Sequence, residues 1–196
     1  MYSPSIEQIK ELRQATLAPM MKCKEALVAS AGDFEKAVAW LNEKGAIKAA
    51  AKSERSVGAG LINAYIHNGG QVGVLLDLRC ETDFVARNQE FKDLAHEICL
   101  QIAAASPRWV SSETVPEDEI KEKKQAWLKE AEALGKPKEV AEKIVQGKLD
   151  SFYKETCLLN QPHFKNEEET INDLIVKTVA KLGENIKVGK FVRFEI

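Results

Sequence analysis

Apolar residues recur every three to four positions through the first 45 residues, and this spacing predicts three short helices. The first begins at a capping box formed by Ser5 and Gln8. The second ends at Gly32, and the third begins at a cap on Asp33 and ends at Gly45. The apolar positions of the first and third helices are Ile6, Ile9, Leu12, Phe34, Ala37, Val38 and Leu41. A bundle this small is marginal on its own and suits docking on a larger body.

The period of the apolar pattern changes from helical to alternating after an Ala/Lys-rich stretch. Residues 46–60 have little apolar face and are expected to form a helical linker. Residues 61–67 and 71–80 flank Asn68-Gly69-Gly70, which is a hairpin signal. In the second of these strands one face carries Val72, Val74, Leu76, Leu78 and Cys80.

The rest of the chain returns to helical periodicity and then to a last strand. A turn over 81–88 leads into a helix over 89–105, and a charged region over 116–153 predicts a helical pair interrupted at Gly135-Lys136-Pro137. A helix over 170–182 and a strand over 186–196 follow. The strand is expected to carry Val188, Val192, Phe194 and Ile196 on one face.

This order of elements predicts an α+β fold. Residues 1–45 form a three-helix bundle and residues 46–60 a linker. Residues 61–196 form an α+β core with a small antiparallel sheet and a helical pair. We expect these three segments to be the domains of the chain.

Composition and charge narrow the classes of function. The chain has 196 residues, of which 44% are hydrophobic and 30% charged, with a formal net charge of −2. A protein that grips nucleic acid usually has a basic excess, so a direct nucleic-acid partner is not expected. No apolar stretch approaches the length of a membrane span, and the N-terminus lacks the apolar core of a signal peptide. We therefore expect a cytoplasmic protein without a membrane partner.

The side chains that support covalent catalysis or metal binding are scattered. The sequence contains no nucleotide-binding glycine motif, no nucleophile elbow and no zinc-binding helix motif, and the three histidines lack metal-ligand spacing. We expect no metal and no cofactor. One enzymatic alternative places Cys80 as a nucleophile with His67 and Asp83. Because Cys80 falls on the apolar face of its strand, a buried thiol is favoured over an activated one. The four cysteines, which are expected to be free, are Cys23, Cys80, Cys99 and Cys157.

A set of short motifs in a fixed order resembles the elongation factor Ts family over nearly the whole chain. The segment Glu-Thr-Asp-Phe-Val-Ala-Arg-Asn at 81–88 resembles the signature of that family, and it lies between the hairpin and a helix, as the family has it. The other matching segments are Leu12-Arg13, Thr16, Met20-Met21, Lys24, Ala26-Leu27, Gly32-Asp33, residues 45–50, Gly135-Lys136-Pro137, residues 142–145, Gln161-Pro162 and residues 183–186.

The resemblance implies a binding function and no enzymatic one. The partner would be the GTPase elongation factor Tu, bound to GDP or free of nucleotide, and the chain would promote GDP release during translation elongation. The bundle resembles a ubiquitin-associated fold and would dock on the nucleotide-binding domain. The Asp83-Phe84 tip would disturb the Mg²⁺ and phosphate region. A chain with a single core is expected to pair with a second copy, and its last strand is a candidate edge for that pairing. A ubiquitin-binding module is a further alternative, but it leaves three-quarters of the chain without a role.

The resemblance also carries partner-binding roles onto particular residues. Thr82 and Val85 flank the Asp83-Phe84 tip. The remaining candidates are Arg13, Met20, Met21, His67, Leu182 and Gly183. Several alternatives stay open. Phe84 is either a core plug or an outward anchor. Asp83 caps the following turn, contacts the partner, or does both, and Gly183 is a helix C-cap as well as a contact. Met20 and Met21 point about 100° apart on a helix, so at least one is expected at the surface.

Some positions depart from the family pattern. Leu17 and Pro19 stand where relatives often have glycines, and Pro19 would lie in the first turn of the second helix. Lys22 replaces a common acid, and Arg79 replaces a frequent asparagine. His163-Phe164 stands where Phe-Val is usual.

Overall fold

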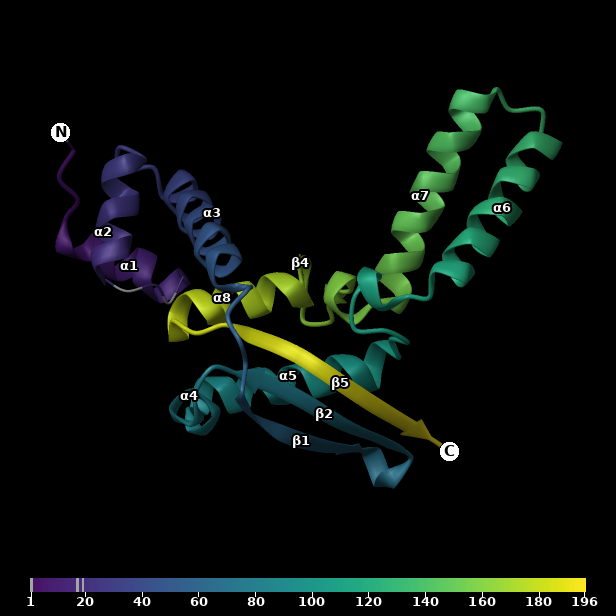
Figure 1. The fold of residues 1–196 in the computed structure, drawn as a ribbon. Coiled ribbons are helices and arrows are strands. Elements are labelled where there is room, and N and C mark those ends of the chain that lie inside the picture. Colours follow the sequence, from purple (N-terminus) through teal and green to yellow (C-terminus); the bar gives the residue numbers. More distant parts are fainter. Residues whose placement is uncertain (1, 17, 19) are drawn as a thin grey trace. The chain divides into compact units, whose positions relative to one another are not determined.

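The computed structural model describes residues 2–16, 18 and 20–196; for residues 46–51 and 68 it describes the backbone alone. The departures at Leu17 and Pro19 lie outside the described residues. The order of elements confirms the predicted α+β class (Figure 1). The helices are α1 (Ile6–Thr16), α2 (Met20–Ala29), α3 (Phe34–Lys52), α4 (Asp83–Arg87), α5 (Gln89–Ala105), α6 (Glu117–Ala133), α7 (Lys138–Thr156) and α8 (Ile171–Leu182). The strands are β1 (Ala59–His67), β2 (Val72–Cys80), β3 (Pro162–His163), β4 (Asn166–Thr170) and β5 (Ile186–Glu195), with short 3-10 turns at Asn68–Gly70, Ser112–Thr114 and Leu158–Asn160.

The chain divides into two compact units, each built from several segments. The first unit contains Met1–Leu61, Arg79–Leu94 and Leu174–Lys187, and the second contains Ile62–Leu78, Ala95–Asp173 and Val188–Ile196. The domain boundaries expected at residues 45 and 60 stay a prediction.

The helical bundle of the first unit begins at the caps that the sequence predicts. The backbone N–H of Gln8 donates to the Ser5 hydroxyl at 3.2 Å, and the Ser5 N–H donates to the Gln8 side chain at 2.9 Å. At the start of α3, the Asp33 carboxylate accepts from the N–H of Lys36 at 3.0 Å. Both caps are therefore confirmed. The bundle core consists of Ile9, Leu12, Cys23, Ala26, Leu27 and Ala37, with Phe34, Val38, Trp40 and Leu41 packed against it.

The third helix is longer than the sequence pattern predicts. The expectation that it ends at Gly45 is wrong, because α3 continues to Lys52. The residues after Gly45 are strong helix formers, and their propensity outweighs the single glycine. A Cβ at Gly45 would lie 3.6 Å from that of Ala180 in α8, which is an ordinary van der Waals contact.

The main sheet has three strands in the order β1-β2-β5. The predicted alternation of β2 is confirmed, since Val74, Leu76, Leu78 and Cys80 are buried. The N–H of Ile196 donates to the Gln71 carbonyl, so the end of β5 meets the start of β2 and the two strands run antiparallel. Within the second unit, α5 covers the inner face of the sheet: the Asn63 amide donates to the Cys99 sulfur at 3.4 Å, and the Tyr65 ring meets the His96 ring edge-on.

The expected common face of β5 is wrong. Val188 is half-buried, but Val192, Phe194 and Ile196 are exposed, and Phe191 and Arg193 are half-buried in their place. The exposure pattern therefore shifts by one residue between Val188 and Phe191. A shift of one position exchanges the two faces of a strand. The Arg193 guanidinium now reaches the Ala103 carbonyl of α5 at 3.2 Å.

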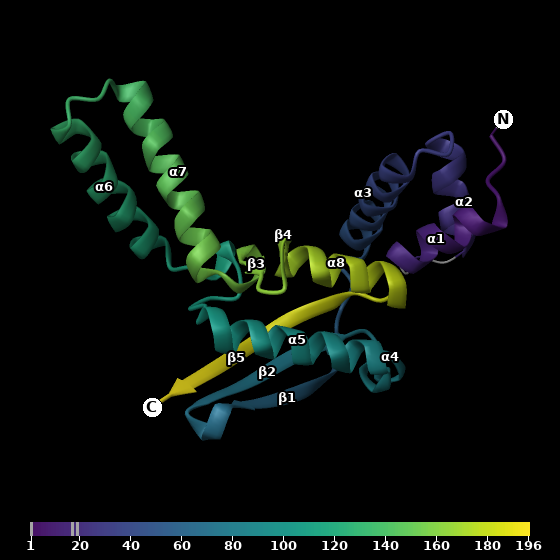
Figure 2. The same ribbon diagram turned by 180° about the vertical axis from the view of Figure 1, so that it is seen from behind.

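Helices α6 and α7 form the predicted antiparallel pair (Figure 2). Gly135 takes a φ of +67° in the turn between them, a value that favours glycine. At the base of the pair, Phe152 contacts the rings of Trp109, Trp127 and Tyr153. These aromatic contacts, with Val115, Leu149 and Cys157, make a second small core.

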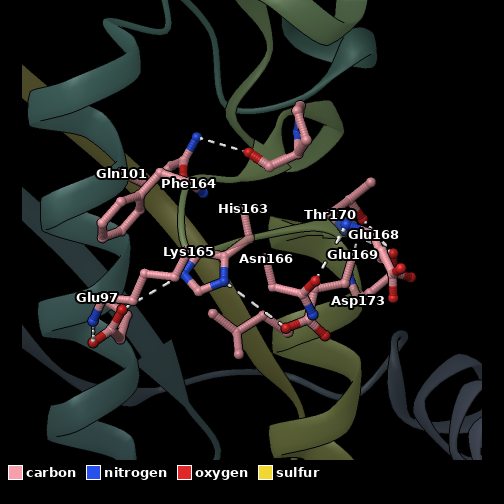
Figure 3. A network of polar contacts seen from close by, with 12 residues as sticks. Glu97, Gln101, His163, Phe164, Lys165, Asn166, Glu168, Glu169, Thr170 and Asp173 are labelled. Carbon is pink, nitrogen blue, oxygen red and sulfur yellow. Dashed lines mark hydrogen bonds and ion pairs between the residues drawn. The ribbon is translucent and has the colours of Figure 1, made fainter.

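The β3–β4 hairpin is attached to α5 by a polar network (Figure 3). The Gln101 side chain accepts from the backbone N–H of Phe164 at 2.9 Å. The His163 ring is almost fully buried, with Nε2 3.5 Å from the carboxylate of Glu97 and Nδ1 3.8 Å from that of Glu169. Neither ring nitrogen has a hydrogen-bond partner among the described residues.

Candidate functional site

The signature segment forms a one-turn helix directly after β2. The sequence pattern indicates a turn here, and the structure places α4 over Asp83–Arg87 with Thr82 as its N-cap. The Thr82 hydroxyl accepts from the N–H of Val85 at 3.5 Å. The alternative in which Asp83 caps the turn is wrong, because Thr82 holds the cap position. The Asp83 carboxylate instead pairs with Arg87 at 2.9 Å along the helix.

The Phe84 side chain points into solvent. It is 84% exposed, and none of the residues of α4, all of which the structure describes, is buried. Val85 is half-buried and Thr82 is exposed. The core-plug alternative for Phe84 is therefore excluded in favour of the outward one. An exposed phenylalanine on a polar helix is a typical anchor for a protein partner.

The C-terminal end of α8 belongs to the same unit as this helix. Gly183 has a φ of +85°, and its N–H donates to the Val179 carbonyl at 2.9 Å, which confirms the C-cap. Leu182 is half-buried. The next residue, Glu184, accepts two hydrogen bonds from Thr82. The structure thus brings Thr82, at the start of the signature segment, next to the residue that follows the α8 turn.

The remaining candidates of the first unit lie on the bundle surface. Arg13 is exposed on α1. Met20 and Met21 at the start of α2 are 44% and 66% exposed, so both methionines face solvent, in agreement with the expectation that at least one would. The core side of α2 is formed by Cys23 and Leu27. Two adjacent exposed methionines are adaptable contact residues.

His67 belongs to the second unit. It lies at the end of β1 and is exposed, with its Nδ1 2.8 Å from the Tyr65 hydroxyl. The ring is thus oriented by a neighbour on its own strand.

The cysteine of the enzymatic alternative is buried, and its surroundings disfavour the thiolate form. Cys80 is fully buried, and its S–H donates to the Thr82 carbonyl at 3.1 Å. Burial raises the pKa of this thiol, and the negative charge of Glu184 and Asp83 raises it further. The thiolate fraction, which is the reactive form, is correspondingly reduced.

The described residues show neither a metal cluster nor a membrane helix. Within residues 2–16, 18 and 20–196, no three His, Cys, Asp or Glu side chains are grouped so that they could hold a metal ion. Among the helices that the structure describes, none is long and apolar enough to cross a bilayer.

Sequence reasoning missed two residues beside this site. Glu184 and Asn185 were included only as part of a family motif, with no role. They contact Thr82 and Glu81, which lie more than a hundred residues earlier in the chain. No local pattern reports a contact at that separation. Their polar character directly after a helix C-cap was the available signal.

These features define a class of protein. An exposed aromatic tip and an exposed methionine pair on a small bundle are typical of the surface of a factor that acts by binding another protein. The comparisons give the particular family.

The chain matches known proteins over almost its full length. The family model described as "Elongation factor TS" matches residues 5–196. The chain is 50% identical to "Elongation factor Ts" of Fervidobacterium nodosum over 98% of each chain. It is 49% identical to the protein of that name from Thermoanaerobacter sp. (strain X514), over 97% of this chain and 94% of the relative. It is 48% identical to that from Heliobacterium modesticaldum, over 96% of this chain and 87% of the relative. The chain therefore belongs to the elongation factor Ts family, the nucleotide-exchange factors of translation elongation.

Proposed function

We propose that this chain accelerates GDP release from elongation factor Tu by inserting the Asp83-Phe84 tip near the Mg²⁺ and phosphate site of the partner. The observation that carries the proposal is the 84% exposure of Phe84 at the start of α4. Asp83 lies beside it, and its carboxylate is exposed enough to meet a group of the partner. This exchange takes place in the cytoplasm. The chain binds elongation factor Tu both in its GDP-bound and in its nucleotide-free state.

The energetics require more contacts than the tip. An exchange factor shifts the nucleotide equilibrium only by its differential affinity for the two states of the partner. A ten-thousandfold loosening of GDP needs about 5.5 kcal/mol of coupling. Burial of Phe84 supplies about 1.5–3 kcal/mol. The remaining coupling free energy has to come from other residues. By reciprocity, bound GDP must weaken the affinity of the factor for the partner by the same free energy.

We propose that exposed residues of the bundle and of the α8 turn supply the rest of this coupling free energy. Met20 and Met21 offer apolar surface, and Arg13 offers a charge, for docking on the nucleotide-binding domain. Leu182 and Gly183 lie in the same unit as the tip and extend its contact surface. In the second unit, His67 is the candidate contact to a distal domain of the partner.

The experiment measures release of fluorescent GDP from elongation factor Tu in the presence of excess unlabelled GDP. Wild-type chain should accelerate release strongly, and Phe84→Ala should do so about ten- to a hundredfold less, the factor that 1.5–3 kcal/mol represents. Phe164→Ala is the matched control, because Phe164 is also partly exposed but lies in the β3–β4 hairpin. Full activity of Phe84→Ala would remove the tip from the mechanism. Absence of any acceleration by the wild type would overturn the exchange function itself.

A second copy of the chain is the partner that we propose for the outer face of the sheet. The outer face of an antiparallel sheet is usually polar when it faces water. Here it carries five exposed apolar residues of the second unit: Ile62, Ile66, Leu75, Val192 and Phe194. Ile66 and Leu75 share a face, because a Cβ at Gly73 would lie 3.3 Å from the Ile66 side chain, and Gly73 alternates with Leu75. On β5, Val192 and Phe194 alternate with Phe191 and Arg193, which are half-buried on the side of α5. The same apolar surface on two copies is self-complementary, and two such sheets can pack face to face.

Sedimentation over a range of concentrations tests this pairing. Phe194 is 68% exposed, and Phe194→Glu places a charge on this apolar face. Wild type should sediment as a dimer and Phe194→Glu as a monomer, while Phe164→Glu, outside the face, should remain dimeric. A monomeric wild type at all concentrations, or a Phe194→Glu protein that dimerises like wild type, would contradict the proposal.

A further inference from the structure

The position of Phe84 has to be fixed from outside its own helix. An isolated helix of a single turn is unstable in water, since nucleation costs more than its few hydrogen bonds return. None of the residues of α4 is buried, so packing of α4 supplies little. Only Val85 and Ala86 of this helix are half-buried. Something must therefore hold the N-terminal end of α4, where Phe84 is the second residue.

The holding group is the carboxylate of Glu184. Its Oε2 accepts from the backbone N–H of Thr82 at 3.0 Å, and its Oε1 accepts from the Thr82 hydroxyl at 2.6 Å. Both oxygens of one carboxylate thus bind one residue. Hydrogen bonds to an ionised acceptor are short and strong, and a bidentate pair also fixes direction. Thr82 is the N-cap of α4, and so the contact acts on the residue that starts the helix.

The neighbouring residues Glu81 and Asn185 join the same two segments, with donor and acceptor exchanged between them. The N–H of Asn185 donates to the Glu81 carboxylate at 2.7 Å. The Asn185 side chain is buried and donates to the carbonyls of Arg55 and Ser53, at 2.8 and 3.3 Å, directly after α3. The end of the bundle, the start of α4 and the end of α8 are therefore joined at residues 184 and 185.

From this geometry we infer that Glu184 is a positioning residue for exchange, which holds Phe84 ready by clamping Thr82. The inference rests on the proposed role of Phe84. A tip that is already in place loses little freedom when it enters the partner, whereas a mobile tip must be ordered at that moment. A displacement of about 1 Å at a functional group can cost as much as a hundredfold in rate.

Four variants test the clamp in the GDP-release assay. Glu184→Ala removes both acceptors, and we expect the maximal release rate at saturating factor to fall about tenfold or more. Glu184→Gln keeps an oxygen for the Thr82 N–H and an amide that donates to the Thr82 hydroxyl, so it should restore most of that rate. Thr82→Val removes the hydroxyl alone and should lie between. Glu90→Gln is the matched control: it alters another α8 contact, the ion pair with Lys181, but no contact of Thr82, and should behave as wild type.

A double-mutant cycle separates a positioning role from general damage. If Glu184 acts through Phe84, Glu184→Ala should reduce the rate less than twofold further once Phe84 is already alanine. An equal loss in both backgrounds would overturn the inference, and so would a wild-type rate for Glu184→Ala when Phe84→Ala is impaired. Thr82→Val keeps the bond from the Thr82 N–H to Glu184, so its combination with Phe84→Ala carries the same test should Glu184→Ala not fold. A wild-type rate for Phe84→Ala is a different result: it removes the proposed tip, and the clamp inference with it.

Discussion

Phe84 and Phe91 are seven positions apart in the sequence, and the structure gives them opposite surroundings. Phe84 is 84% exposed on α4, and Phe91 is fully buried in α5. Full burial of such a side chain contributes about 1.5–3 kcal/mol, so the buried sixth of Phe84 is worth less than about 0.5 kcal/mol. Alanine also has the higher helix propensity, by about 0.5 kcal/mol. Phe84→Ala should therefore leave the free energy of unfolding unchanged within about 0.5 kcal/mol.

The same substitution at Phe91 should behave differently. Truncation of a buried phenylalanine costs about 3–5 kcal/mol through lost transfer free energy and the cavity that remains. Urea denaturation followed by far-ultraviolet circular dichroism measures both variants. At an m-value of about 2 kcal/mol/M, the Phe91→Ala midpoint should fall by about 1.5–2.5 M, and the Phe84→Ala midpoint by less than about 0.3 M. If the Phe84→Ala midpoint fell as far as that of Phe91→Ala, Phe84 would be a core residue, and its role as an outward anchor would be refuted.

Three further predictions follow from particular contacts. Burial raises the pKa of every cysteine thiol. Ellman's reagent at pH 8 should therefore react slowly with the native protein and reach four equivalents in urea. A rapid reaction of the native protein would contradict the burial of Cys23, Cys80, Cys99 and Cys157. Gly183→Ala should lower the free energy of unfolding in urea by about 1 kcal/mol because its φ is +85°, whereas Gly147→Ala, inside α7 with open space around it, should raise it by a similar amount; equal effects would refute the conformational reasoning. His163→Phe removes two buried ring nitrogens without hydrogen-bond partners, which typically cost about 1–3 kcal/mol each. This variant should therefore have a higher melting temperature than wild type. A lower melting temperature would show that the contacts with Glu97 and Glu169 stabilise the hairpin.

Much of the local structure could be read from the sequence. The caps at Ser5, Asp33 and Gly183, the alternation of β2 and the break between α6 and α7 are signals that act within a few residues, and the structure confirms each of them. The order of these elements was sufficient for the α+β class. The same local motifs, in their order, were sufficient for the family.

Other features depend on which segments meet in space. The faces of β5 were predicted wrongly, because packing against α5 outweighed the local pattern. Burial of His163 between two carboxylates likewise has no sequence signal.

The candidate site shows the same division. The sequence determined the chemistry of the tip, since Thr82, Asp83 and Phe84 are adjacent and form a recognisable motif. It left open whether Phe84 points inward or outward, and it gave no role to Glu184. Only the tertiary structure decided both, because the exposure of a side chain and a hydrogen bond across 102 residues depend on the packing of distant segments. Local propensities act over a turn or two of chain, whereas the contacts that hold the tip form only when α8 and the end of β2 are brought together by folding.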